Sequence, residues 1–306
     1  MNKLQINSDS LRMKYVSSKA LFKLTNRQFW QSIGEPIYAY IFSILLLGIF
    51  GGINGGNFET LAELERFKAG IIGLISMQIL SVGIMTLPTV VMEFKTSVLL
   101  KRIGATSITP VLFLFTISFY YFLILISQVV WMLLWVVIFF GFNTITDVGV
   151  AESGQLWVNV MFSTIDWPGY IFSTFYTVIT TLSFAALIIA ISKTAVGVNV
   201  VGSIIFFSCM FLSGQLLPMV QIVQNEALRI ISYLTPFRYT TGLTLMSWIG
   251  DSPFIIDKDF TQSLFPGGPE LVVYSVVDQY LNWFIPLLII AVTTFASLKL
   301  FKWNAR

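Results

Sequence analysis

Few side chains of this sequence are of types that carry out chemistry. Its 306 residues include no histidine and one cysteine, Cys209. Ser-His-Asp and Cys-His catalysis, histidine-ligated metals, cysteine-based zinc sites and internal disulfides are therefore excluded. General acid–base chemistry would have to use carboxylates such as Asp251, Asp257 and Asp259, and no paired spacing marks them for it. Cys209 lies in an apolar run, where we expect a small buried side chain.

Nucleotide hydrolysis has no site in this sequence either. A P-loop requires the pattern GxxxxGK[ST], and no Gly-Lys pair occurs in the chain. The stretch 212–215 (LSGQ) is similar to the nucleotide-sensing signature of ABC ATPases, but it lacks one glycine and ends an apolar segment. We therefore expect no cofactor on this chain.

The composition indicates a multi-pass membrane protein. Hydrophobic residues make up 56% of the sequence and charged residues 11%, and 28 residues are phenylalanine. A soluble domain carries about 25% charged residues, because its whole surface meets water. This chain cannot cover a surface in that way, so its solvent must be largely apolar.

Six apolar segments are each long enough to cross a bilayer as a helix, which takes about 20 residues. The predicted fold class is therefore an all-α polytopic membrane protein. Within the third segment, no Gly, Pro or Asn lies between Val111 and Phe140, so we expect one long helix there. The predicted spans lie near residues 35–53, 69–92, 108–140, 168–192, 195–218 and 281–299.

The stretch 228–250 is fairly apolar and raises the question of a seventh span. It contains Arg229 and Arg238, and an arginine at mid-bilayer costs roughly 2.5–3.5 kcal/mol on insertion scales. Pro236 would also break the middle of such a helix. We therefore expect amphipathic or re-entrant helices within an outer segment, 219–280, that precedes the last span.

The distribution of charge predicts the orientation. With six spans and both termini on one side, thirteen of the 18 Lys and Arg lie on that side and five on the other. Twelve of the 15 acidic residues lie on the opposite side. Because short cytoplasmic loops retain Lys and Arg, both termini are predicted to be cytoplasmic, in a bacterial cytoplasmic membrane. Residues 1–34 then form a cytoplasmic or interfacial segment, and 35–306 form a single transmembrane domain.

The middle of every predicted span lacks Asp, Glu, Lys and Arg, and Glu35 stands at the cytoplasmic edge of the first. Secondary transporters usually hold or relay an ion on intramembrane ionisable groups. The sequence therefore disfavours a transporter that powers itself, and it has no arginine-rich voltage sensor or TVGYG-like filter. For a transporter, we expect energy to enter from a partner at the cytoplasmic face.

A candidate docking element for that partner directly follows the second span. The stretch 93–106 is long enough for a short interfacial helix with an apolar side and a charged side. The alternative is an ordinary positively charged loop that lies on lipid headgroups. The candidate residues for coupling to an ATPase are Glu93, Lys95, Leu99, Leu100, Lys101, Arg102 and Thr106.

Three features together resemble a permease subunit of the type-two ABC exporters, a superfamily that exports drugs, polysaccharides, teichoic acids and lipids. The first is the order of a basic N-terminal segment, six spans and a large outer segment before the last span. The second is the 93–106 loop, a loose match to the family's charged Leu-x-x-Leu segment, with Ser107 where proline is common. The third is the most specific: 211–218 resembles the family's FLSG-xxx-P ending, and 231–239 (ISYLTPFRY) its Pro-aromatic-x-Tyr element.

The resemblance implies a mechanism. Two permease copies, identical or related, would pair around a central pathway, above two ABC-type ATP-binding subunits that carry ATP and magnesium. Closure of those subunits would push on 93–106 and on the N-terminal segment, where Lys19, Lys23 and Arg27 form a basic stripe at i, i+4 and i+8. Contact of this stripe with membrane lipid headgroups is an open alternative. No nucleic acid is expected among the partners.

The resemblance also places the pathway along the second and fifth spans. Phe and Met surfaces suit hydrophobic or amphipathic cargo, because they bind by area and adapt in shape. For each such residue, packing against lipid or helices is the alternative. Candidate pathway residues are Gln78, Ser81, Thr86, Asn199, Ser203, Phe206, Phe207, Met210 and Phe211.

The outer re-entrant motif and two packing features complete these expectations. Folding of the outer cap is the alternative to substrate contact for the motif. Pro88 is expected to kink the second span, and the hydroxyls of 174–183 are expected to satisfy helix–helix contacts. The motif comprises Ser213, Gly214, Pro218, Pro236 and Tyr239.

The function predicted from the sequence is the transmembrane permease subunit of an ATP-driven exporter of a hydrophobic or amphipathic substrate, with ATP hydrolysis on a separate subunit. Two alternatives stay open at this point. One is an intramembrane lipid or sugar transferase, which would have to use the outer carboxylates. The other is a non-transporting membrane scaffold or immunity protein that binds an ATPase.

Overall fold

The structure is a computed structural model that describes residues 2–54, 61–96, 108–142, 156–217, 219–249, 253–254, 260–261 and 272–301. Its elements in chain order are α1 (Asn2–Gln31), α2 (Gly34–Pro36), the π-helix η1 (Ile37–Ile41), α3 (Phe42–Asn54), α4 (Leu61–Leu80), the π-helix η2 (Ser81–Thr86), α5 (Leu87–Thr96), α7 (Pro110–Phe140), α8 (Trp157–Ser163), α9 (Trp167–Ile191), α10 (Ala195–Leu212), α11 (Met219–Gln224), α12 (Glu226–Ser232), α13 (Phe237–Ile249), β1 (Phe260–Thr261), β2 (Val272–Tyr274) and α14 (Val276–Leu300).

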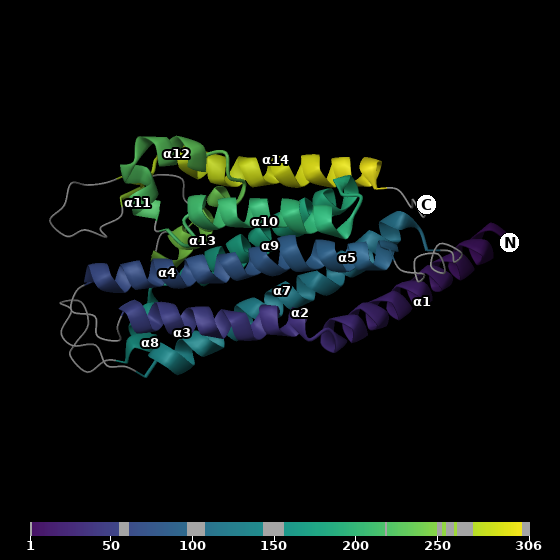
Figure 1. Ribbon diagram of the computed structural model, residues 1–306, viewed down its shortest axis with the longest axis horizontal. Helices are drawn as coiled ribbons and strands as arrows, with labels where there is room; N and C mark the ends of the chain where they lie inside the picture. The colour runs from purple at the N-terminus through teal and green to yellow at the C-terminus, as the bar shows by residue number, and fades with distance from the viewer. Residues whose placement is uncertain are drawn as a thin grey trace.

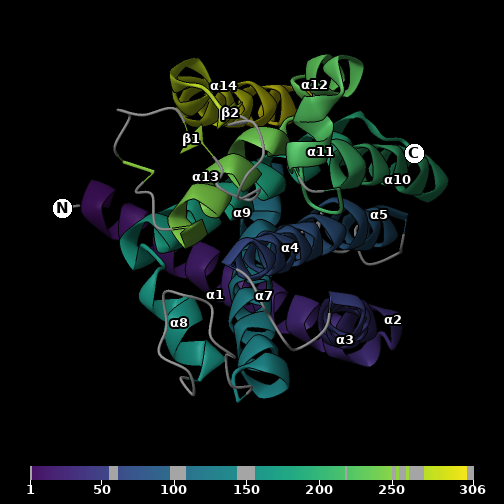
Figure 2. The ribbon, with the colours of Figure 1, turned by 90° about the vertical axis from the view of Figure 1, so that its left-hand side faces the viewer.

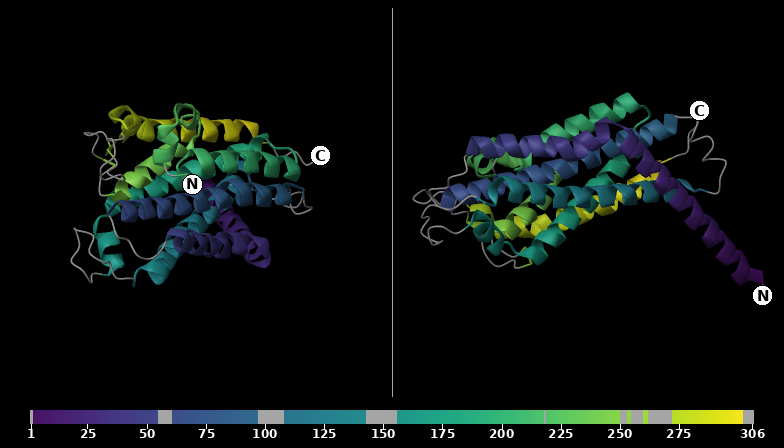
Figure 3. Two further views of the ribbon diagram at one scale, coloured as in Figure 1. Left: turned by 60° about the vertical axis from the view of Figure 1, so that its left-hand side comes forward. Right: turned by 90° about the horizontal axis from the view of Figure 1, so that it is seen from below.

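The long helices lie side by side in one bundle (Figure 1). Helix α1 leaves this bundle obliquely at one end, which is clearest in the right-hand view of Figure 3. The last turn of α14 lies at the same end (Figure 1). We call this the N-terminal end of the bundle and the opposite one the far end.

The all-α polytopic fold predicted from the sequence is confirmed. A bent pair of helices, Tyr15–Gln31 and Gly34–Phe50, meets at 80° and supplies a sixth candidate span beside five single helices. Because α1 leaves the bundle at this bend, the stretch from α2 through α3 corresponds to the predicted first span. Within the described residues, the five single helices long and apolar enough to cross a membrane are Phe67–Lys95, Pro110–Phe140, Trp167–Ile191, Ala195–Leu212 and Val277–Leu300.

Two helix boundaries differ from the predicted ones. The fifth predicted span reaches residue 218, but α10 ends at Leu212, because Gly214 has a φ of 80° and terminates the helix. The last span begins before residue 281, because Ser275 caps α14. The Ser275 hydroxyl accepts from the Asp278 N–H at 3.2 Å, and the Asp278 carboxylate accepts from the Ser275 N–H at 3.0 Å. Helix α7 is uninterrupted, as predicted.

Residues 228–250 form no seventh span. Helices α12 and α13 lie on either side of Pro236 and contain 7 and 13 residues. At about 1.5 Å of rise per residue, neither can cross a hydrocarbon core of about 30 Å. Helix α13 packs against α9, α14 and α4 at the far end, as the end-on view of Figure 2 shows. This agrees with the predicted re-entrant helices, whereas the small antiparallel pair β1–β2 was not predicted.

The second span forms the centre of the bundle. Within its most apolar stretch 83% of the residues are buried, against 22% for α14. Its segment η2 packs closely on two neighbours, because Gly83 lies against the methyl group of Thr181 in α9 and Gly202 of α10 lies against the carbonyl oxygen of Ile84. Small residues permit such close approach between helices. The second span therefore cannot shift without moving α9 and α10.

Pro88 accounts for the π-helical form of η2. Proline has no N–H, so the carbonyl of Ile84, four residues earlier, loses its usual helical donor. The chain accommodates this with the π-helix η2 and then continues as α5. The predicted kink therefore takes the form of a π-helical segment within a helix that remains one span.

Candidate functional site

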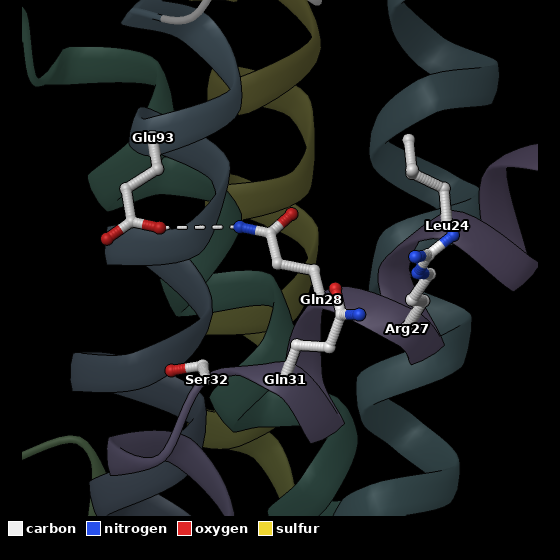
Figure 4. A pocket seen from close by; sticks show the side chains of 6 residues that line it. All are labelled: Leu24, Arg27, Gln28, Gln31, Ser32 and Glu93. Carbon is white, nitrogen blue, oxygen red and sulfur yellow. Dashed lines mark hydrogen bonds between the residues drawn. The ribbon is translucent and has the colours of Figure 1, made fainter.

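The predicted coupling segment begins where α5 meets α1 at the N-terminal end. Glu93 projects from α5, and its carboxylate accepts a hydrogen bond of 3.3 Å from the Gln28 side-chain amide of α1. The two side chains face one another at the edge of a hollow of about 470 Å³ (Figure 4). The hollow is lined by Leu24, Arg27, Gln28, Gln31, Ser32 and Glu93.

Lys95, two residues further on, points to other elements. Its ammonium donates to the carbonyl oxygen of Ile189 at 3.0 Å and lies 4.5 Å from the centroid of the Phe301 ring. Ile189 is in the last turn of α9, where a cation is favoured by the helix dipole. Glu93 and Lys95 thus connect the end of the second span to α1 on one side and to α9 and the end of α14 on the other.

The remaining coupling candidates, Leu99, Leu100, Lys101, Arg102 and Thr106, lie outside the described residues. The basic stripe of α1 is described, and Lys19, Lys23 and Arg27 are all exposed. The opposite face of α1 is buried through Leu21, Thr25 and Phe29. That face packs on α7, where the Phe22 ring lies 5.2 Å from the Tyr120 ring, centroid to centroid.

Two polar contacts hold this corner together. The Tyr121 hydroxyl of α7 donates to the Glu35 carboxylate at 3.1 Å, and the Tyr120 hydroxyl donates to the Asn26 side chain at 3.1 Å. The Glu35 carboxylate also lies close enough to Glu93 for the two to repel each other. Two acidic groups therefore stand near one another where the first span begins.

In the second span, Gln78 and Ser81 are buried. The Gln78 amide donates to the carbonyl oxygens of Tyr38 and Ala39, at 2.7 and 3.0 Å. Tyr38 and Ala39 belong to η1, whose i→i+5 pattern leaves backbone acceptors to be satisfied by neighbours. The hydrogen bonds of Gln78 therefore join the first span to the second. A contribution of Gln78 to the pathway stays a prediction. The Ser81 hydroxyl donates to the Gln78 carbonyl oxygen at 2.9 Å.

Helix α10 presents one face to the bundle and leaves the other uncovered. Phe206 and Met210 are buried, as is Cys209, which agrees with its expected role as a small buried residue. Asn199, Phe207 and Phe211 are exposed, and Ser203 and Thr86 are half-buried. The Asn199 side-chain oxygen accepts from the Thr89 hydroxyl of α5 at 2.7 Å. The pathway candidates of the fifth span are thus divided between a packed face and an open one.

The hydroxyls of α9 mostly bond within their own helix. Thr177, Thr180 and Thr181 donate to the carbonyl oxygens of Ser173, Tyr176 and Thr177 at 2.7–2.8 Å. Their methyl groups are then free to pack against neighbours. The expected helix–helix contact is therefore made by methyl packing, as at Gly83, more than by interhelical hydrogen bonds.

At the far end, the outer motif forms the turn after α10. Ser213 is fully buried, and Gly214 supplies the left-handed conformation of this turn. Pro218 lies outside the described residues. Pro236 separates α12 from α13, and the Tyr239 hydroxyl donates to the Tyr233 carbonyl oxygen at 2.6 Å. These contacts place the motif in the fold of the far end.

A buried polar cluster at the far end was not predicted. Arg238 is only 1% exposed, and its guanidinium lies 3.7 Å from the Asp278 carboxylate and 3.9 Å from the centroid of the Tyr233 ring. It also donates to the Ser232 hydroxyl. The Tyr233 hydroxyl donates to Asp278 at 2.7 Å. Burial raises the pKa of Tyr233 above its ordinary value, as does its hydrogen bond to Asp278, so the phenol keeps its proton as the donor.

The contacts of Arg238 with Asp278 and of Gln28 with Glu93 were both unpredicted, and each left a signal in the sequence. Arg238 was recognised as incompatible with a lipid-facing span, and a buried arginine is stabilised by an acidic partner. Asp278 is one of the twelve acidic residues predicted on that side of the membrane. Gln28 lies one residue from the stripe member Arg27, on the side of α1 that faces α5. Neither pairing could be assigned from spacing alone, because 40 and 65 residues separate the partners.

Comparison with known proteins settles the family. The model of the ABC-2 type transporter family matches residues 19–247, from the basic stripe of α1 almost to the end of α13. The chain belongs to the ABC-2 type transporter family. No curated protein matches the chain as a relative.

Family membership gives this permease its general role and implies one partner. An ABC-2 permease is the transmembrane component of its transporter, and membership implies an ABC-type ATP-binding partner. The apolar helices and the family together make the chain a multi-pass membrane protein. The carboxylates Asp251, Asp257 and Asp259 lie outside the described residues.

Proposed function

We propose that this permease moves a hydrophobic or amphipathic substrate, such as a drug, a lipid or a lipid-linked polymer, out across the cytoplasmic membrane. ATP hydrolysis takes place on a separate ATP-binding subunit that docks at the N-terminal end of the bundle. Two permease copies, identical or related, enclose the pathway. The N-terminal end, with both termini, is cytoplasmic in this proposal.

The observation that carries the proposal is the connection of the second span at Glu93 and Lys95. The most buried span of the bundle ends at two charged residues that contact α1 through Gln28 and α9 through Ile189. The predicted docking segment continues directly from these residues. A displacement of that segment is therefore transmitted to the centre of the bundle, since η2 is closely packed against α9 and α10.

The open face of α10 supports the pathway assignment. It combines the polar Asn199 and Ser203 with Phe207 and Phe211, whereas the exposed side chains of α14 before Lys299 are apolar or aromatic except for Thr294. A purely apolar face suits lipid, and a mixed polar and aromatic face suits an amphipathic cargo or a second permease copy. The pathway accordingly runs along α10 and the neighbouring part of α5.

The test is the substrate-stimulated ATPase activity of the permease co-purified with its ATP-binding subunit. Glu93→Ala should lower the stimulated activity by about fivefold or more, the lower range of typical coupling free energies, and leave basal hydrolysis unchanged. The matched control is Glu226→Ala, which removes an exposed carboxylate from α12 at the far end and should have no effect. Arg102→Glu, a charge reversal in the docking segment, should weaken co-purification.

Two results would overturn the proposal. One is normal docking and normal stimulation in both Glu93→Ala and Arg102→Glu. The other is a stimulated activity that is equally low in Glu226→Ala, because the loss would then have no connection to the docking end. Lipophilic drugs, lipids and wall-polymer precursors are the substrate classes to screen in this assay.

A further inference from the structure

The hollow at the N-terminal end lies at the level where the first span begins. Four of its six lining residues come from the last turns of α1, Ser32 directly follows that helix, and Glu93 comes from α5 (Figure 4). The chain bends by 80° directly after α1 and enters the bundle at Gly34. The hollow is therefore placed beside the headgroup layer of the leaflet on the N-terminal side. Its volume of about 470 Å³ lies within the range of small-ligand sites, roughly 300–1,000 Å³.

The lining carries opposite charges on separate walls. Arg27 stands on the α1 wall, and within the described residues no ion pair involves it. Glu93 stands on the α5 wall, with Glu35 close enough to repel it. A cation placed in the hollow beside Glu93 would be attracted by its carboxylate. An anion placed between Arg27 and the amide of Gln31 would meet hydrogen-bond donors.

The surface beside the hollow is apolar and aromatic. Ile33 is 80% exposed and Trp30 57% exposed, and the Trp30 ring stacks on Tyr40 of the first span with a centroid distance of 6.0 Å. Tryptophan at the end of a membrane span is characteristic of the lipid–water interface. A ligand that fills the hollow would thus have acyl-chain contacts available immediately beside it.

We propose that this hollow binds the headgroup of one amine-bearing zwitterionic phospholipid, of the phosphatidylethanolamine type. The lipid phosphate lies against Arg27 and Gln31, and the lipid ammonium lies against Glu93. The acyl chains run along Ile33 and the beginning of the first span. The bound lipid would then lie where Gln28 joins α1 to the second span, and its headgroup would be part of the coupling corner. The inference rests on the proposed function for the side of the membrane that the hollow faces.

The experiment counts phospholipids retained by the full chain. The protein is purified in mild detergent, delipidated and titrated with phosphatidylethanolamine, phosphatidylglycerol or phosphatidylcholine, and bound lipid is measured by native mass spectrometry. Phosphatidylethanolamine should bind one per chain and more tightly than the other two. Arg27→Gln and Glu93→Gln should each weaken its binding about tenfold, the effect of losing one charge-assisted hydrogen bond.

The matched control is Lys23→Gln, which removes an exposed cation of the same stripe one turn before Arg27 that does not line the hollow. It should leave the affinity unchanged. Phosphatidylglycerol has no ammonium, so its binding should fall in Arg27→Gln and stay the same in Glu93→Gln. Gln31→Leu, which keeps both charges, should lower the binding of every phospholipid by a smaller factor.

Several outcomes would overturn the inference. Equal binding of all three lipids, or a loss in Lys23→Gln as large as in Arg27→Gln, would indicate non-specific attraction to the stripe. Displacement of the lipid by inorganic phosphate alone would indicate a simple anion site. If Arg27→Gln lost the ATP-binding subunit and kept its lipid, the hollow would be a protein-docking surface.

Failure of this inference is distinguishable from failure of the proposed function. Lipid retention is measured without ATP, and stimulated hydrolysis is measured with it. A Glu93→Gln variant that loses stimulation while it keeps the preference for phosphatidylethanolamine supports coupling and refutes the lipid site. A variant that loses the preference and keeps stimulation does the reverse.

Discussion

The two ends of the bundle are held together in different ways. At the far end, a fully buried arginine, Arg238, joins α13 to α14 through Asp278, with Tyr233 against both. At the N-terminal end, α1 meets the second span through a long hydrogen bond between Gln28 and an exposed Glu93, beside an open hollow. Both contacts use charged residues, but Arg238 is buried whereas Glu93 is exposed.

This difference indicates which end can move. An exposed hydrogen bond exchanges with water, so its net contribution to stability is small, typically about 0.5–1.5 kcal/mol. Removing one partner of a buried ion pair costs roughly 3–5 kcal/mol, because the other charge is left in an apolar environment. The N-terminal end can therefore rearrange at low cost when a partner pushes on it, while the far end resists. We interpret the second span as the connection between an N-terminal end that rearranges at low free-energy cost and a far end that resists rearrangement.

The largest expected effect comes from breaking the far end. Arg238→Met should lower the free energy of unfolding by roughly 3–5 kcal/mol, since Asp278 would remain buried without its cation. The measurement is thermal unfolding of the purified protein in detergent, with Glu226→Ala as the control. A change no larger than that of the control would show that the far end is not held by this pair. Adding Asp278→Leu to Arg238→Met should recover part of the loss, because no buried charge would then remain.

A smaller effect is expected at the centre that joins the two ends. Gly83→Ala places a methyl group against Thr181 and should destabilise the fold by about 1–3 kcal/mol through overpacking. Gly48→Ala, in the first span, has nothing within 4 Å of the added methyl and should be neutral or slightly stabilising. Equal unfolding temperatures for the two variants would contradict the close packing of η2 on α9.

Tyr233→Phe tests the far-end contact through the pH dependence of the free energy of unfolding. The pKa of Tyr233 is raised in the folded protein above the ordinary value near 10. The contribution of its protonated phenol to the free energy of unfolding is therefore complete below about pH 10 and is lost as the pH rises further. Wild type should therefore lose stability as the pH rises above 10, and the variant should lose less of it. At neutral pH the variant should be less stable by about 1.5 kcal/mol, the lower range for a hydrogen bond to a charged group. The same slope in both proteins above pH 10 would contradict this contact.

The smallest effect on stability is expected at the N-terminal end. Gln28→Leu removes the donor to Glu93 and should change the free energy of unfolding by less than about 1 kcal/mol, because Glu93 is open to water. Its effect should appear in stimulated ATPase activity of the assembled transporter instead. An unfolding temperature as low as that of Arg238→Met would show that the two ends are equally firm and would break the comparison.

Much of the fold followed from local sequence features. The uninterrupted apolar run from Val111 to Phe140 was sufficient for α7, and Pro236 with its flanking arginines was sufficient to reject a seventh span. Gly214 marked the end of α10 only approximately, because composition alone does not show which residue takes a positive φ. The early start of α14 was missed because Asp278, Gln279 and Asn282 are polar. Tertiary packing buries them, and an apolar-run criterion cannot anticipate that.

The candidate site was less accessible from the sequence than the fold. Glu93 and Lys95 were selected by their position after the second span, but their partners Gln28 and Ile189 are 65 and 94 residues away along the chain. Gln78 was selected as a polar residue in a span that the family resemblance assigned to the pathway. The structure uses its amide to satisfy the π-helical backbone of η1, a need that arises only after two helices have packed.

The sequence by itself determined the solvent, the approximate spans and the family, because apolar runs, charge placement and short motifs are properties of neighbouring residues. Only the tertiary structure decided which face of α10 stays open, which acid balances Arg238 and how the end of α1 meets α5 at the hollow. These features depend on residues distant in the chain that are brought together by packing. The physical reason is that burial, and with it the strength of every charged contact, is set by the neighbours a side chain acquires on folding.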